Sequence, residues 1–136
     1  MTLPRWQIRF LAAVTALVLP LAGCGKVYKV NSLELAVKQA SDPFQIRDKV
    51  VGKTIETQMI VENFVDEGSD AKLIDALDGF FCRMKPSEFE KHNDRGVLVV
   101  RGTLVQDGGE IGLDHCEFVS NDANWKATST YNDLVR

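Results

Sequence analysis

The sequence predicts a small, mainly β domain, and three observations support this prediction. Residues 54–64 (TIETQMIVENF) alternate apolar and polar side chains with the period of two that is typical of a half-buried strand. Residues 97–105 (VLVVRGTLV) are rich in β-branched side chains, which favour strands. Asp78-Gly79 and residues 106–109 (QDGG) are turn signals that connect strands into hairpins.

The N-terminal residues have the composition of an export signal. Arg5 and Arg9 precede an uncharged apolar run at 10–21, which is shorter than the roughly 20 residues that a membrane-spanning helix needs. The run ends in Leu21-Ala22-Gly23-Cys24, which looks like the lipobox of bacterial lipoproteins. The alternatives are a true membrane anchor and a plain signal peptide with a chance cysteine.

A lipobox implies a processed and anchored protein. Residues 1–23 would be the lipoprotein signal peptide, Cys24 would carry the lipid, including palmitate, and residues 24–31 would be a short tether. Several acyl chains together anchor a protein stably to a membrane. We therefore expect a periplasm-facing protein of the cell envelope. Gly25, where an Asp would favour the inner membrane in lipoproteins, makes the outer membrane the more probable location.

The charge balance is acidic. The chain has 16 basic and 19 acidic residues, a net charge of −3. Removing a signal that contains Arg5 and Arg9 leaves 14 basic residues (16 − 2) against 19, or −5. Because phosphates repel an acidic surface, this balance predicts that nucleic acid is an unlikely partner.

The cysteine count predicts a disulfide. Of the three cysteines, Cys24 is assigned to lipid, which leaves Cys82 and Cys116. A pair of cysteines in an exported domain usually oxidises. The alternative is two buried, reduced thiols that act as small apolar side chains.

A helix is predicted before the first strand. Asn31 and Glu34 have the spacing of a capping box, and Asp42-Pro43 ends the helix because a residue before proline leaves the α region. Residues 44–51 then form a connector. The apolar stripe that we expect to pack on the domain comprises Leu33, Ala36, Val37 and Ala40.

The remaining elements follow from composition and spacing. Residues 80–84 predict a strand, 86–91 a short helix and 110–119 the second strand of the last hairpin, whereas 72–77 fits a strand or a helical turn. Gly102 indicates a bulge or tight bend. Leu113 and Cys116 can both face inward only through a second bulge, and Trp125 is expected to pin an otherwise loosely held polar tail at 120–136.

Taken in order, these elements predict a five-stranded Greek-key OB-fold barrel over residues 32–119, with an N-terminal helix and a short helix between strands three and four. The sequence also resembles the bacterial "tRNA anticodon-like" OB-fold family. The matching stretches are 51–56 (VGKTIE), 81–84 (FCRM), 99–103 (VVRGT) and 113–116 (LDHC). This resemblance implies a small exported or lipid-anchored protein, but it does not specify a ligand.

The sequence contains no recognisable catalytic centre. His92 is expected in an exposed loop, and His115 is expected to be a partly buried core residue. The acidic residues of 66–70 (DEGSD) lack the later glutamate of an EF-hand loop, so a solvated turn is expected there. We therefore expect no enzyme activity, no metal and no cofactor.

These observations lead to one main hypothesis and two alternatives. The main hypothesis is a lipid-anchored envelope binding or adaptor module, attached to the membrane through Cys24, whose partner is a protein, a peptide or a glycan. The first alternative is an oligonucleotide-binding OB-fold protein. The second is a domain that senses a small ligand or a metal through its acidic loop.

Overall fold

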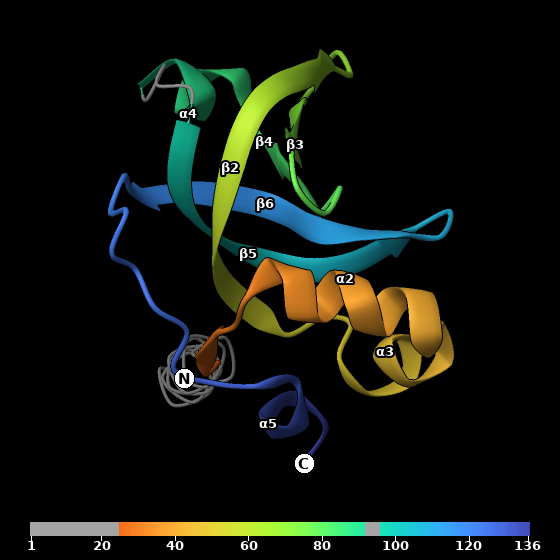
Figure 1. The fold of residues 1–136 in the computed structure, drawn as a ribbon. Helices are drawn as coiled ribbons and strands as arrows, with labels where there is room; N and C mark the ends of the chain where they lie inside the picture. Colours follow the sequence, from red (N-terminus) through yellow and green to blue (C-terminus); the bar gives the residue numbers. More distant parts are fainter. Residues whose placement is uncertain (1–24, 92–95) are drawn as a thin grey trace, which may run out of the picture.

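A computed structural model describes residues 25–91 and 96–136, and it shows a closed β-barrel (Figure 1). Five strands follow one another around the barrel in the order β2-β3-β4-β6-β5, and β5 pairs again with β2. This is the strand order of an OB-fold, so the predicted fold class is confirmed. The strands are β2 (Thr54–Asp66), β3 (Ala71–Asp75), β4 (Phe81–Met84), β5 (Gly96–Asp107) and β6 (Glu110–Ser120).

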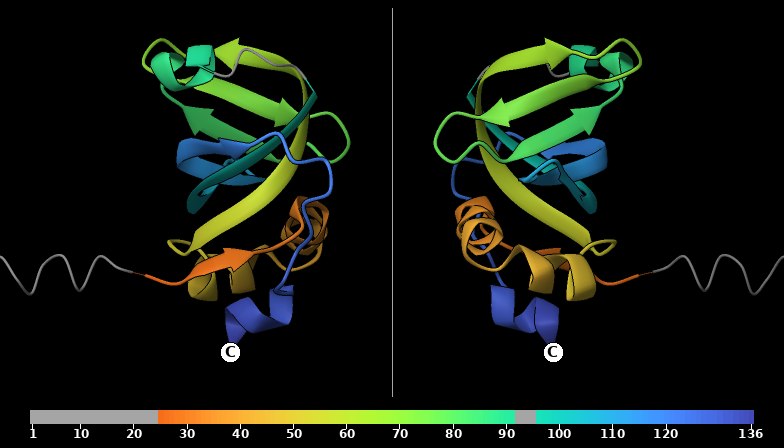
Figure 2. Two further views of the ribbon diagram at one scale, coloured as in Figure 1. Left: turned by 90° about the vertical axis from the view of Figure 1, so that its left-hand side faces the viewer. Right: turned by 90° about the vertical axis from the view of Figure 1, so that its right-hand side faces the viewer.

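Helices lie at both ends of this barrel. Figure 2 shows α2, α3 and α5 gathered at one end and α4, the predicted helix between the third and fourth barrel strands, at the other. A short strand, β1, precedes α2 and pairs in parallel with the start of β2. These elements are β1 (Val27–Lys29), α2 (Ser32–Ser41), α3 (Pro43–Lys49), α4 (Pro86–Lys91) and α5 (Tyr131–Val135).

The first barrel strand has the predicted inward face. Ile55, Thr57, Met59 and Val61 are all buried, as a period of two requires when one face lines the core. An unbroken antiparallel register joins β2 to β5, from Thr54 opposite Thr103 to Val61 opposite Gly96. The core therefore lies inside the barrel. The outward faces of the strands can be covered by other elements of the chain or can bind a ligand.

Helix α2 begins where predicted but presents a different face to the barrel. The Asn31 side chain accepts a hydrogen bond from the Leu33 amide at 3.0 Å, which caps the helix. The buried side chains include Leu35 and Gln39, whereas Leu33 and Val37 are more than half exposed. The predicted stripe was thus wrong, because a ten-residue helix with scattered small apolar residues fits more than one face.

The predicted connector at 44–51 is also wrong, since most of it belongs to helix α3. Asp42 caps this helix by accepting a hydrogen bond from the Gln45 amide at 3.1 Å, and Pro43 occupies its first turn. Proline is well tolerated there because the first amide of a helix lacks an intrahelical partner. Asp42-Pro43 therefore ends one helix and starts the next, and Ile46 enters the core.

The irregularities predicted at Gly102 and between Leu113 and Cys116 lie opposite each other in the last hairpin and form one bulge. The β5–β6 register shifts between Arg101 and Thr103, around Gly102. A Cβ at Gly102 would lie 2.7 Å from the Asp114 carbonyl oxygen, so the close approach of the strands requires glycine. His115 has a φ of 53°, and this left-handed residue turns Cys116 into the core.

Trp125 pins the C-terminal segment to β2 as predicted, but the segment is not loosely held as expected, because α5 contributes side chains to the core. The Trp125 indole N–H donates to Glu56 Oε2 at 2.9 Å, and Tyr131 and Leu134 of α5 are buried. Glu56 is itself only 3% exposed and also accepts from Arg101 at 2.8 Å. Burial alone raises the pKa of Glu56, but the hydrogen bonds from Trp125 and Arg101 and the nearby Lys29 outweigh it and lower the pKa below its ordinary value.

We expect Trp125→Phe to destabilise the fold, because it removes the indole N–H and leaves a buried carboxylate short of a donor. A hydrogen bond to a charged group contributes about 1.5–3 kcal/mol. The pKa of Glu56 is lower in the folded than in the unfolded protein. The ionised Glu56 carboxylate therefore contributes fully to the free energy of unfolding above the ordinary pKa of 4.5, and this contribution is lost as pH falls through the folded pKa. Denaturant unfolding at about pH 7 and about pH 3.5 should therefore show a larger loss at the higher pH.

Lys126→Ala, which removes an exposed side chain from the same segment, is the control for this experiment. An equal loss of stability at both pH values in Trp125→Phe would contradict the assigned role of the Glu56 carboxylate.

Candidate functional site

One side of the barrel carries a connected set of polar side chains on the outer surface of β3, β4 and β6. Alternation along these strands turns Leu73, Cys82 and Leu113 into the core and their neighbours outward. We call this surface the outer face, and its residues are Lys72, Ile74, Phe81, Arg83, Glu110, Gly112 and Asp114.

Phe81 lies at the centre of the outer face, yet it is fully buried. Gly112 of the neighbouring strand makes room for it, since a Cβ at that position would come within 2.4 Å of the Phe81 ring. Two cations cover the ring: Lys72 Nζ lies 4.9 Å and Arg83 Cζ 4.7 Å from its centroid. Both distances are within the range of cation–π attraction.

Carboxylates hold the two cations in place. Arg83 pairs with Glu67 at 2.9 Å, with Asp114 at 3.3 Å and with Asp107, and Lys72 pairs with Glu110 at 3.0 Å. The hydrogen bonds that Arg83 donates to its three carboxylate partners, the one to Asp107 above all, raise the pKa of Arg83 above its ordinary value. Arg83 thereby ties the β2–β3 loop and the end of β5 to strand β4.

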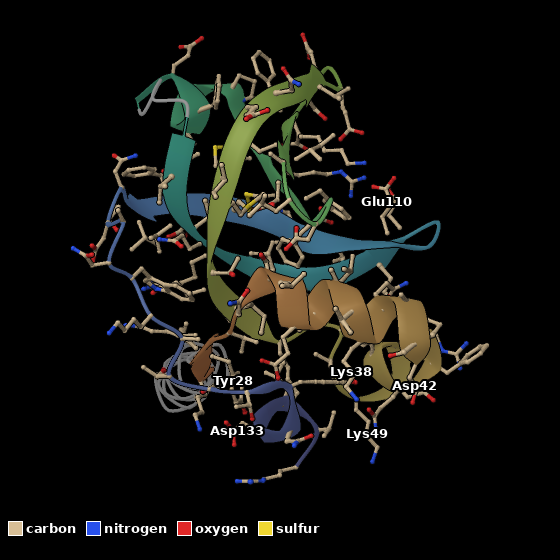
Figure 3. The ribbon with its side chains drawn as sticks, in the orientation of Figure 1. Tyr28, Lys38, Asp42, Lys49, Glu110 and Asp133 are labelled. Atoms are coloured by element: carbon tan, nitrogen blue, oxygen red, sulfur yellow. A yellow bond between two sulfur atoms is a disulfide. The ribbon has the colours of Figure 1, made fainter. Side chains whose placement is uncertain are left out.

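Figure 3 shows where Glu110, the partner of Lys72, lies relative to the helical end of the molecule. Glu110 lies at the edge of the barrel beside the β5–β6 turn, while Lys38, Lys49 and Asp133 lie at the end that carries α2, α3 and α5. The outer face borders α2 at this edge, where Ile74 and Glu110 line a hollow together with Gln39.

A groove continues from the outer face toward the start of α4. It has a volume of about 630 Å³ and lies between the β2–β3 loop, the N-terminal turn of α4 and the β6 bulge. Lys85, Ser87 and His115 are exposed on its walls and offer hydrogen-bond donors to a ligand. Its other lining residues are Ser69, Asp70, Arg83, Pro86 and Asp114.

An aromatic pair lies on the other side of the β2–β3 loop. The Phe64 and Phe89 rings are 4.8 Å apart, and Phe64 is 48% exposed. Together with Ala71 and Pro86 they line a hollow of about 380 Å³. Exposed aromatic rings and hydrogen-bond donors therefore lie on either side of one loop.

The predicted disulfide between Cys82 and Cys116 is confirmed. Their Cα atoms are 6.0 Å apart, and the bond joins β4 to β6 directly after the His115 bulge. The bulge is what brings the Cys116 side chain to the same side of the sheet as Cys82. Sequence spacing alone could suggest the pair, but the backbone turn that unites it comes from His115.

The other predicted site residues have mixed outcomes. Cys24 and His92 lie outside the described residues, so lipidation of Cys24 stays a prediction. His115 is exposed on the bulge, and its expected place in the core was wrong because its left-handed backbone turns Cys116 inward instead. In the acidic loop, Asp66 accepts from the Gly68 amide and Glu67 binds Arg83.

Two features are absent from the part of the chain that the structure describes. In 25–91 and 96–136, no group of three or more His, Cys, Asp or Glu side chains has the geometry to hold a metal ion. Within the same ranges, no helix is both long and apolar enough to cross a membrane.

Comparison with known proteins gives a structural likeness. No family model matches the chain, and no curated protein matches it in sequence. Among solved structures, a chain from the crystal structure of yeast Stn1 and Ten1 is similar at 20% identity with a TM-score of 0.41. The similarity covers 72% of this chain and 65% of the yeast chain, so this protein spans slightly less than two thirds of that chain's length.

Three expectations need correction in view of this finding. The similar chain comes from a structure of yeast Stn1 and Ten1, so the finding does not support the expected lipid-anchored adaptor or its outer-membrane location. The finding does not support the statement that nucleic acid is an unlikely partner either. That statement used the net charge of the whole chain, which does not reveal that Lys72, Arg83 and Lys85 lie near one another among their carboxylate partners.

Replacing both Cys82 and Cys116 by alanine should lower the free energy of unfolding by about 3–4 kcal/mol, according to the chain-entropy model for a loop of this length. Removing both cysteines avoids a free thiol. Denaturant unfolding of the double variant measures the loss, and the wild-type protein under reducing conditions is the matched comparison. Equal stability of oxidised, reduced and double-alanine proteins would contradict a structural role for this bond.

Proposed function

We propose that this protein is a non-catalytic OB-fold module that binds a short single-stranded oligonucleotide through its outer face. The observation that carries the proposal is the position of Phe81 between Lys72 and Arg83 on the middle strands of the barrel. A single strand needs aromatic surfaces for its bases and cations for its phosphates, and this side of the barrel has both.

The loops around the outer face support the same proposal. OB-folds bind oligomers on their second and third strands and on the loops that flank them. In this chain those strands are β3 and β4, and the flanking segments supply the groove with Lys85, Ser87 and His115. The Phe64 and Phe89 pair offers a second aromatic surface within the same region.

The polar groups of the outer face favour binding over a reaction. Lys72 and Arg83 are held in ion pairs with carboxylates, which is unlike the arrangement of a nucleophile beside its base. We therefore assign no substrate turnover to this surface.

The charges also define how such binding should respond to salt. Lys72, Arg83 and Lys85 are the cations of this region, and four carboxylates compete for two of them. Each phosphate neutralised on a single strand contributes about −0.7 to the slope of log K against log salt. One to three contacts therefore predict a shallow slope, between about −0.7 and about −2, with base stacking supplying much of the affinity.

Fluorescence anisotropy with labelled single-stranded DNA and RNA of about ten nucleotides tests the proposal. We expect saturable binding at about 50 mM salt, with the shallow slope given above. Lys85→Ala should weaken binding by about 3- to 10-fold, as expected for the loss of one phosphate contact. Lys49→Ala, an exposed lysine at the helical end of the molecule, is the matched control and should leave affinity unchanged (Figure 3).

Two results would contradict the proposal. One is the absence of saturable binding to either nucleic acid at low salt. The other is an equal effect of Lys85→Ala and Lys49→Ala, which would indicate attraction to positive charge anywhere on the surface rather than binding at the groove.

A further inference from the structure

We infer that Phe81 is a covered stacking platform, which the side chains of Lys72 and Arg83 close and which a single strand opens by displacing their carboxylate partners. This inference rests on the proposed function and adds a mechanism that controls access to the same site. Four steps lead to it.

The first step is the unusual burial of Phe81. Its neighbours Cys82 and Met84 belong to the hydrophobic core, but Phe81 points to the other side of β4, where a half-buried sheet meets solvent. It is nevertheless completely buried. Strand alternation does not explain this burial, whereas the two cations over its ring do.

The second step is the contrast between the two sides of the ring. Beneath it lies Gly112, which is fixed by backbone pairing with Phe81. Above it lie two long side chains with several rotatable bonds, Lys72 and Arg83. The cover can therefore move without any change in the strands, and a movement would expose a ring that is already held in position.

The third step is the exposure of the groups that hold the cover. The side chains of Asp107 and Glu110 are 55% and 57% exposed, and those of Glu67 and Asp114 are about one third exposed. Ion pairs at such positions are screened by salt and contribute little individually. A phosphate can replace these carboxylates on arginine, because guanidinium binds phosphate in the same two-point geometry.

The fourth step is the coupling between the two parts of the ligand. When a phosphate draws Arg83 or Lys72 away from its carboxylates, the same movement uncovers Phe81 for a base. One event thus supplies a cation contact and a stacking surface, while the closed state keeps an aromatic ring out of water. The measured affinity is then the affinity of the open state multiplied by the fraction of molecules that are open.

The inference predicts that weakening the carboxylates strengthens binding. In Asp107→Asn/Glu110→Gln, both cations lose a partner, and we expect affinity for the oligonucleotide to rise by about 10-fold or more. Glu117→Gln removes a negative charge from the wall of the neighbouring pocket without touching the cover, so it controls for the general effect of charge. Adding Phe81→Leu, which keeps an apolar side chain but lacks the π face, should abolish most of the gain.

Exposure of the ring is measured independently of any ligand. A 4-fluorophenylalanine placed at position 81 reports solvent contact through the change of its ¹⁹F shift between H₂O and D₂O. We expect a small change in the wild-type protein, a larger one in Asp107→Asn/Glu110→Gln and at high salt, and no increase in Glu117→Gln. Circular dichroism establishes that each variant is folded.

The outcomes separate this inference from the proposed function. If the ring becomes exposed in the double variant and no oligonucleotide binds, the proposed function and the stacking role are both wrong, and only the cover stands. If the ring stays shielded in the double variant and at high salt, the cover is wrong even where binding occurs. If the ring becomes exposed but affinity rises only as much as in Glu117→Gln, the control of access is wrong.

Discussion

The pairing between β4 and β6 is the shortest in the barrel, because it is only two residue pairs long. Phe81 pairs with Gly112 and Cys82 with Leu113, in parallel, whereas the joint between β2 and β5 extends over eight pairs. Parallel pairing of such short segments provides few hydrogen bonds. The pairing of β4 with β6 therefore depends on side-chain interactions, which are present on both faces of the sheet.

On the inner face of the sheet, the stabilising interaction is a covalent bond. The Cys82–Cys116 disulfide lies directly beside this pairing, and the left-handed backbone at His115 makes its geometry possible. On the outer side, Phe81 packs over Gly112 and is covered by Lys72 and Arg83. The candidate site thus lies over the shortest pairing in the barrel, where ion pairs reach the β2–β3 loop, the end of β5 and β6 at once.

The sequence predicts the barrel well because its long strands have regular patterns. The period of two in 54–64 and the β-branched run at 97–105 identify β2 and β5, and the disulfide follows from the cysteine count. The helical end is predicted less well. Asp42-Pro43 ends α2 and also starts α3. Interpreted only as a helix end, the pair does not predict α3.

The candidate site could be predicted only in part. Alternation indicates that Phe81 and Arg83 share a face of their strand, but the sequence does not show that β3 supplies Lys72 and β6 supplies Gly112 beside them. That neighbourhood results from the strand order, in which β4 pairs with β6 rather than with the next strand along the chain. For the same reason, net charge does not reveal that Lys72 and Arg83 lie over one aromatic ring among four carboxylates.

The most direct test of the account is a titration of ¹⁵N-labelled protein with a single-stranded oligonucleotide, followed by amide chemical shifts. The account predicts progressive, saturable shifts for Lys72, Phe81, Arg83 and Gly112, together with the groove residues Ser87 and His115, and little change in α2 and α3. Shifts confined to the helical end, or no shifts at low salt, would contradict the assignment of the outer face as a nucleic-acid interface.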